Sequence, residues 1–166
     1  MKRRIAVDLR FQVIMPGKLQ NAPIKALWED YAARCRRLGG QLRLDLVTKV
    51  GSGAGGRSAA LEREAEALLA RVASPRSKVI ALTEHGELMD SPELARRIGN
   101  YRDSASPDMA LLVGSARGLG QLALERAHLR LALSRLTLPH ELVLPVLAEQ
   151  LYRALSILAG TPYHRS

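Results

Sequence analysis

Apolar residues along this chain follow two spacings, the compact runs typical of buried strands and the i, i+3, i+4 spacing of amphipathic helices. The compact runs predict strands over residues 10–15, 78–83 and 109–113, and the alternation of leucines with other residues predicts a further strand over residues 42–47. Helical spacing predicts helices over about 24–38, 58–72, 91–102, 119–130 and 142–158. Because strands alternate with helices, we expect an α/β domain in which a parallel sheet lies between two helical layers.

Turn and capping residues set the expected boundaries of these elements. The glycine-rich segment 51–56 predicts a mobile loop after the second strand, and residues 85–86 predict a loop after the third. Ser58 and Ser91 are expected to cap the N-termini of the helices that follow them. Residues 131–138 form a further short apolar element that ends before a proline.

The length and composition favour one domain. The chain has 166 residues, of which 47% are apolar, so we predict a single domain over residues 1–166. Residues 1–9 are a possible N-terminal extension and 160–166 form a tail. No apolar run approaches the roughly 18 residues of a membrane span, so the protein is expected to stay in the cytosol. Cys35 is the only cysteine, which favours a partly buried structural thiol.

The charge favours a polyanionic partner. The formal net charge is +9, and all but five of the 25 basic residues are arginine, whose planar fork suits phosphates and base edges. Nucleic acid is therefore the first candidate partner, with a merely soluble basic surface as the alternative. Aromatic residues make up only 4% of the chain, which argues against a base-stacking platform.

Local motifs exclude several kinds of site. Residues 51–56 lack the Gly-Lys-Ser/Thr ending of a phosphate-binding loop, and residues 114–118 lack the three-glycine spacing of a dinucleotide site. The second segment is either a ligand-binding loop or a plain strand-to-helix turn. No two histidines have the i, i+4 spacing of a helical metal site, so no metal is expected. His128 is predicted to lie on a helix in a structural or solvated position, whereas His140 and His164 are candidates for contacts.

Three ordered motifs near the chain end carry a family resemblance. They are Leu-Ser-Arg-Leu-Thr-Leu-Pro-His at 133–140, Ala-Glu-Gln-Leu-Tyr-Arg-Ala at 148–154 and Pro-Tyr-His-Arg at 162–165. Together they resemble the C-terminal signature of the RlmH family, and weaker matches extend upstream at 111–114, at Leu82 with Gly86, and at 17–19. Members of that family are small SPOUT-type methyltransferases that methylate N3 of a pseudouridine in 23S ribosomal RNA.

The resemblance implies a fold and a cofactor that composition does not show. The fold would be a SPOUT-type parallel sheet, three-layer α/β/α, with a C-terminal trefoil knot, in a homodimer; an unaided topology prediction would reject a knot. The cofactor would be S-adenosyl-L-methionine, held by loops at the ends of adjacent strands. The implied cofactor-binding residues are Leu82, Gly114, Leu133, Ser134, Arg135, Leu136, Thr137 and Leu138.

The resemblance also implies roles near the chain end. Methyl transfer from a sulfonium needs no metal, but the imide nitrogen must lose its proton, and a nearby cation stabilises the anion. Candidate catalytic residues are Arg153, His164 and Arg165, and candidate contacts to the substrate RNA are Tyr152, Tyr163, His140 and Lys18. The tail of one subunit would complete the pocket of the other. A competing interpretation makes Arg153 a structural ion-pair partner of Glu149, four residues before it.

Two other functions stay open at this point. Ser115, Arg117 and Leu144 depart from the family's pattern, which would suit a SPOUT methyltransferase for a different RNA position. The other alternative is a noncatalytic RNA-binding or ribosome-assembly homologue.

Overall fold

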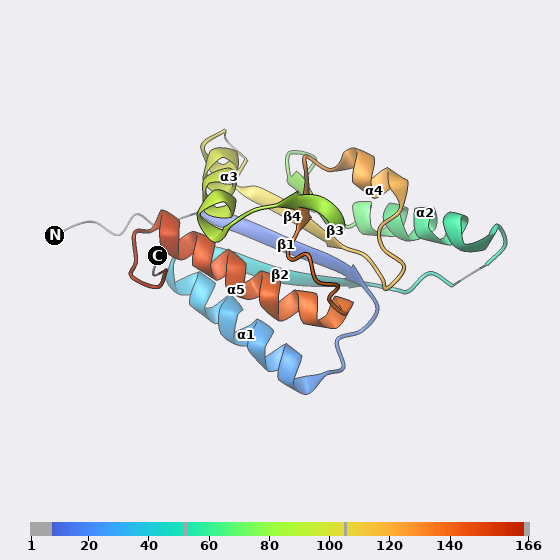
Figure 1. The fold of residues 1–166 in the computed structure, drawn as a ribbon, viewed down its shortest axis with the longest axis horizontal. Helices are drawn as coiled ribbons and strands as arrows, with labels where there is room; N and C mark the ends of the chain where they lie inside the picture. The colour runs from blue at the N-terminus through green and yellow to red at the C-terminus, as the bar shows by residue number, and fades with distance from the viewer. Residues whose placement is uncertain (1–7, 52, 105, 165–166) are drawn as a thin grey trace.

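The computed structural model describes residues 8–51, 53–104 and 106–164. Among these residues, five parallel strands form one sheet in the order β2-β1-β4-β3-β5, with helices on both faces (Figure 1). The strands are β1 (Leu9–Pro16), β2 (Gly40–Val47), β3 (Lys78–Leu88), β4 (Asp108–Val113) and β5 (Leu129–Ala132). The helices are α1 (Ala22–Arg37), α2 (Gly56–Leu69), α3 (Ser91–Asp103), α4 (Gln121–Arg126) and α5 (His140–Leu158). The predicted three-layer α/β architecture is confirmed.

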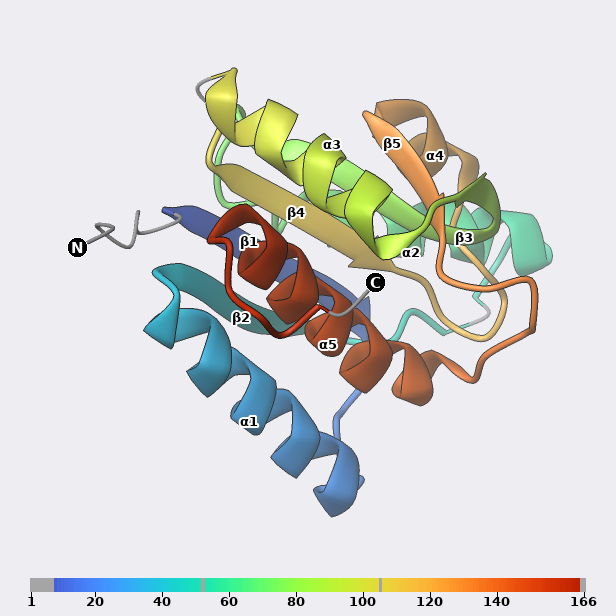
Figure 2. The same cartoon turned by 60° about the vertical axis from the view of Figure 1, so that its left-hand side comes forward.

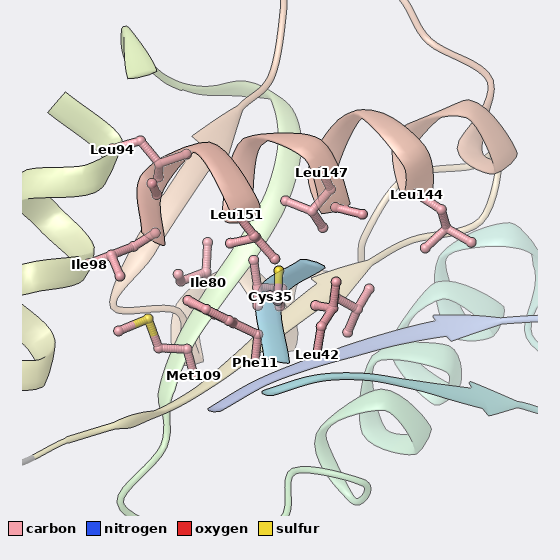
Figure 3. Close-up of a cluster of buried hydrophobic side chains, with 14 of the residues drawn as sticks. Phe11, Cys35, Leu42, Ile80, Leu94, Ile98, Met109, Leu144, Leu147 and Leu151 are labelled. Carbon is pink, nitrogen blue, oxygen red and sulfur yellow. The ribbon is translucent and has the colours of Figure 1, made fainter. Parts of the chain in front are cut away.

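Side chains on the two faces of the sheet enter different apolar cores. Phe11, Val13 and Met15 of β1 pack with α1, α3 and α5, whereas Ile14 between them packs with α2 and α4. Figure 3 shows the larger core, where Leu147 and Leu151 of α5 lie over the sheet. Because both faces are covered, β4 and the first half of β3 are continuous apolar runs that the sequence predicted well, whereas β2, at the edge of the sheet, alternates apolar and polar residues.

The third strand is longer than its sequence predicts. Instead of ending before a loop at residues 85–86, β3 continues to Leu88, with a register shift against β5 between Leu82 and Glu87. Gly86 makes this possible, because a Cβ there would lie 2.6 Å from the carbonyl carbon of Leu131. The predicted loop was wrong because the backbone of β5 supplies hydrogen-bond partners that local pattern does not reveal.

The region after residue 120 also differs from the prediction. The helix expected to reach residue 130 ends at Arg126, and Leu129–Ala132 form β5 beside β3. His128 is therefore not helical. Its ring Nδ1 accepts the backbone N–H of Val79 at 3.0 Å, and the backbone N–H of His128 donates to the Val79 carbonyl at 2.8 Å. Burial, with nearby cations, lowers the pKa of His128 and keeps the ring neutral as an acceptor.

Neither Ser58 nor Ser91 is the N-cap of its helix, so both predicted caps were wrong. The N-cap of α3 is Asp90, whose carboxylate accepts the N–H of Glu93 in a reciprocal capping box. The N-cap of α2 is Gly55, which has a positive φ of 103° and provides no side-chain cap, so Ser58 lies inside the helix. Leu9, assigned to the possible extension, is buried in β1.

The last helix returns over the front of the sheet. After β5 at the sheet edge, α5 packs between α1 and α3 (Figure 2). This order is consistent with the trefoil knot that the resemblance implies, and the threading itself stays a prediction. Pro145 lies beyond the first turn of α5, where it has no N–H to donate to Glu141. Within the described residues, no helix has the length and apolar character needed to cross a membrane.

Candidate functional site

The loops predicted to bind a cofactor meet at one edge of the sheet. Strands β4, β3 and β5 are neighbours, and Leu82 near the middle of β3 pairs with Val113 on one side and Leu131 on the other. The segments that follow Val113 and Ala132 therefore leave the same edge of the sheet on the two sides of β3. Ligands of open parallel sheets bind at this carboxyl edge, so the topology brings together the residues that the sequence motifs only suggested.

The loop after β4 is tightly folded. Gly114 has no room for a side chain, because a Cβ there would collide with the carbonyl oxygen of Gly118. The N–H of Gly118 donates to the carbonyl of Ser115 at 2.9 Å, and Gly118 itself has a positive φ of 93°. The segment 114–118 is thus a closed turn that requires glycine at both ends.

The loop after β5 presents apolar surface. Leu133, Ser134 and Leu138 are half-buried, whereas Arg135 and Thr137 are exposed and Leu136 is 76% exposed. The Ser134 hydroxyl accepts the N–H of Leu136 at 2.9 Å and shapes the turn. Leu82 is also half-buried. An exposed leucine beside half-buried ones fits an apolar ligand face such as adenine.

Two hollows in the described part of the chain are lined by none of the residues predicted to bind the cofactor. One hollow, of about 450 Å³, lies at Arg36 and residues 39–43, and the other, of about 250 Å³, lies between residues 87–89 and α3. The predicted cofactor pocket therefore stays a prediction, and its walls are the three loops alone in a single chain.

Carboxylates of α2 hold the loop after β4, a role that sequence analysis missed. Glu64 is only 2% exposed, and its Oε1 accepts the N–H of Ser115 at 3.1 Å. Its Oε2 is buried without a hydrogen-bond partner among the described residues. Glu62 accepts the N–H groups of Gln121 and Leu122 at 2.6 and 3.0 Å and so caps α4. The available signal was Glu64 itself, an acidic residue among the apolar positions of the helix.

A second cluster joins α5 to the tail. Glu149 Oε1 accepts from Nε and Nη2 of Arg153 at 3.0 and 2.6 Å, and from the Tyr163 hydroxyl at 3.0 Å. The Arg153 guanidinium lies 4.8 Å from the Tyr163 ring centroid, and its Nη1 is 3.4 Å from Nδ1 of His164. The hydrogen bonds to Glu149 raise the pKa of Arg153. The ion pair with Glu149 is confirmed, and Arg153 also contacts the tail residues predicted to act with it.

Aromatic rings extend this cluster to α1. Tyr163 packs edge-on against Tyr152 with centroids 4.6 Å apart, and Tyr152 lies 6.1 Å from Tyr31, which the sequence analysis did not single out. Burial, with hydrogen bonding to Tyr31 and Glu149, raises the pKa of Tyr163. The tail up to His164 is therefore held in place by α5 and by α1.

The structure does not bring the two groups of residues together within one chain. His140 begins α5 next to the loop after β5, and Arg153 lies thirteen residues further along. At about 1.5 Å of rise per residue, Arg153 lies about 20 Å along α5 from His140, where the loop after β5 ends. Lys18 is exposed after β1, also at the carboxyl edge, and Arg165 lies outside the described residues.

Other chemistry finds no support in the described part of the chain. No group of three His, Cys, Asp or Glu side chains there is placed to hold a metal ion. Cys35 is fully buried under α5, and burial raises the pKa of its thiol to about 12. The thiol is therefore structural, as predicted.

Comparisons with known proteins define the class of this protein. Residues 9–164 match the family model described as a predicted SPOUT methyltransferase, so the chain belongs to the SPOUT methyltransferase family. The fold is similar to that of a solved structure titled "Crystal Structure of Probable Methyltransferase from Bordetella pertussis Tohama I". That match has a TM-score of 0.55 at 19% identity and covers 90% of this chain and 96% of the other, so it supports the fold alone.

Curated relatives place the chain more narrowly. Proteins named Ribosomal RNA large subunit methyltransferase H are 41% identical over 163 residues in Cereibacter sphaeroides and 35% identical over 159 residues in Rhizobium etli. Each match covers 95% of this chain and 99% of the relative. The chain thus belongs to the family whose signature its C-terminal motifs resemble, and that prediction is confirmed.

Proposed function

We propose that this protein transfers a methyl group from S-adenosyl-L-methionine to N3 of a pseudouridine in 23S ribosomal RNA. The observation that carries the proposal is the extent of the match to the large-subunit methyltransferases, which covers 95% of this chain and 99% of the relative. A basic surface, the carboxyl-edge loops and an ordered tail support the same function. The protein would act in the cytoplasm, where ribosomes are found.

The loops after β4 and β5 have the character that the cofactor needs. When bound, S-adenosyl-L-methionine supplies a methyl group already activated by its sulfonium, so no metal is required. Leu82, Leu133 and Leu138 would face the adenine, and Leu136, which is 76% exposed, would close over it. The Gly114 turn would bring backbone N–H and C=O groups close to the ligand. Ser134, Arg135 and Thr137 would add polar contacts at the rim.

The tail cluster would act on the base. N3 of the base gives up its proton to solvent, and the resulting anion is stabilised by the Arg153 guanidinium, which stays charged beside Glu149. His164 and Arg165 would orient the nucleotide with Arg153. Tyr152 and Tyr163 would stack on it or hydrogen-bond to it, while His140 and Lys18 would contact the flanking RNA. Positioning of the two reactants then supplies much of the rate enhancement.

A homodimer would complete each site. Arg153 lies about 20 Å along α5 from His140, which adjoins the loop after β5, so a partner's tail would bring the Arg153 guanidinium to the methyl group. Leu27 on α1 and Leu142 and Val146 on α5 are 47%, 45% and 39% exposed, an unusual amount for large apolar side chains on neighbouring helices. This surface of α1 and α5 is the proposed dimer interface.

Mass spectrometry of ribosomal RNA from a strain that lacks the gene tests the reaction. We expect the methyl group on one pseudouridine of 23S RNA to disappear and to return when the gene is restored. Loss of a methyl group at a different nucleotide would favour the alternative RNA target. An unchanged modification pattern in the strain that lacks the gene, together with a purified protein that does not bind S-adenosyl-L-methionine, would favour the noncatalytic alternative.

Mixed dimers test the shared site. Gly114→Ala disables a cofactor loop and Arg153→Ala disables a tail, and each homodimer is expected to be inactive. When the two variants are coexpressed, about half of the dimers are mixed, and one of their two sites has both parts intact. Recovery to about a quarter of wild-type activity is expected. No recovery, in dimers verified by mass, would place each site within one chain.

A further inference from the structure

Cations gather on one half of the carboxyl edge. Lys18 follows β1, Lys49 follows β2 and Arg117 follows β4, and these strands are neighbours in the order β2-β1-β4. Lys18 and Lys49 are exposed, and Arg117 is half-buried. We call these three residues the rim cations. Arg117 belongs to the loop after β4, which is one wall of the proposed cofactor site, and Lys18 and Lys49 belong to the two neighbouring loops.

Contacts between the loops hold the rim cations in one surface. The side chain of Lys49 runs over Gly17, because a Cβ at Gly17 would lie 2.8 Å from Lys49 Cε. The Gly17 N–H donates to the Val47 carbonyl at 2.8 Å, which joins the loop after β1 to the end of β2. Nη2 of Arg117 donates to the Val50 carbonyl at 3.3 Å and joins the loop after β4 to the loop after β2.

No carboxylate in the same loops balances the charge of the rim cations. Residues 17–21, 48–55 and 114–119 contain Lys18, Lys49 and Arg117 and no Asp or Glu. Among the residues that the structure describes, no ion pair within 4 Å involves a rim cation. Three like charges gathered at one surface attract an anion, and the buried Glu64 that accepts the N–H of Ser115 offsets only part of their charge.

The other half of the same edge has the opposite balance. Residues 83–90 and 133–141, at the ends of β3 and β5, contain four carboxylates and a single arginine. A phosphate chain that reaches the cofactor loops therefore meets attraction on the β2-β1-β4 side and repulsion on the β3-β5 side.

We infer that the rim cations bind consecutive phosphates of the ribosomal RNA strand next to the target nucleotide, so that this stretch of the strand runs over β1 and β2. This inference rests on the proposed function, because it takes the RNA as the polyanion. Lysine and arginine contacts to phosphates carry no sequence information, so the rim sets the position of the strand, and the pocket selects the base.

The experiment compares binding to ribosomal particles from a strain that lacks the gene. The test variant is Lys49→Gln with Arg117→Gln. The matched control is Arg36→Gln with Arg37→Gln, which removes two exposed arginines at the amino edge of the sheet. A third variant, Lys49→Arg with Arg117→Lys, keeps both charges while changing the contact to Val50. Dissociation constants are measured by cosedimentation between 50 and 200 mM KCl, and the KM for S-adenosyl-L-methionine is measured alongside.

The test variant should bind about tenfold more weakly, and the slope of log K against log salt should fall by about two, since each cation lost releases about one counterion fewer. The control and the charge-keeping variant should bind the particles like the wild type, and the control should keep the wild-type KM for the cofactor. An unchanged salt slope in the test variant, or an equal loss in the control, would overturn the inference. If the wild-type protein binds these particles but methylates none of them, the proposed function fails, while the salt slopes still decide the role of the rim.

Discussion

Replacing Arg153 with alanine removes a guanidinium whose contribution to folding is small. Its side chain is 26% exposed, and that of its partner Glu149 is 19% exposed. A partly exposed i, i+4 ion pair contributes about 0.5 kcal/mol, and a cation–π contact such as that with Tyr163 about 0.5–1 kcal/mol. We therefore expect the variant to lose about 1 kcal/mol of stability, which lowers the Tm by about 2–4 °C in a chain of this length.

The expected effect on methyl transfer is much larger. A preorganised cation that stabilises developing charge is typically worth about 10²–10³ in kcat. Domains of this size are stable by about 5–15 kcal/mol, so a loss of 1 kcal/mol leaves almost every molecule folded. A hundredfold loss of turnover in Arg153→Ala would thus come from the site and not from unfolding.

Two measurements on the same variants separate the roles of Arg153. Transfer of a labelled methyl group to unmodified ribosomes gives turnover, and calorimetry gives the Tm. Glu149→Gln is the matched control, because it weakens the ion pair but keeps the guanidinium and a hydrogen-bond acceptor. We expect it to keep at least about a tenth of wild-type turnover. Turnover of Arg153→Ala within about fivefold of the wild type, or equal losses in both variants, would leave Arg153 with only its structural role.

Three further predictions follow from buried groups. Gly114→Ala should weaken S-adenosyl-L-methionine binding at least about tenfold in calorimetry, because its Cβ would displace the Gly118 carbonyl; Gly51→Ala, with open space at its Cβ, is the control, and equal affinities would remove this turn from the cofactor site. Glu64→Ala should raise the hydrogen-exchange rate of the Ser115 amide and weaken cofactor binding, whereas Glu64→Gln keeps an acceptor oxygen and should do neither; fast exchange in both would contradict the proposed anchor. Because the pKa of Cys35 is raised to about 12, the thiolate fraction at pH 8 is about one in 10⁴, so a disulfide reagent should modify the thiol only after unfolding, and rapid labelling of the native protein would show an open core.

Signals local in the sequence were sufficient for much of the fold. Strands β1 and β4 follow from compact apolar runs, because the sheet is covered on both faces and most of their positions are apolar. The extension of β3 and the existence of β5 could not be predicted this way. Both depend on pairing between β3 and β5, which lie far apart in the sequence: Glu87 pairs with Leu131, and the backbone N–H of His128 donates to the Val79 carbonyl.

The candidate site likewise contains some residues that the sequence predicted and others that only the structure revealed. Motifs near the chain end identified Arg153, Tyr163 and His164, and the structure places all three in contact. Glu64 and Tyr31 were not predicted, because each has an ordinary helical position in the sequence. Only the tertiary structure shows that Glu64 contacts Ser115 and that Tyr31 packs against Tyr152.

The sequence by itself determined the class of fold, the family and most of the residues that are candidates for chemistry, since these depend on residue types and short spacings. Only the tertiary structure decided the strand order, the tight turn at Gly114 and the separation of about 20 Å along α5 between His140 and Arg153. It also decided that Lys18, Lys49 and Arg117 share one surface. The physical reason is that parallel strands bring the ends of distant segments to one edge, and which ends become neighbours depends on pairings that no local pattern encodes.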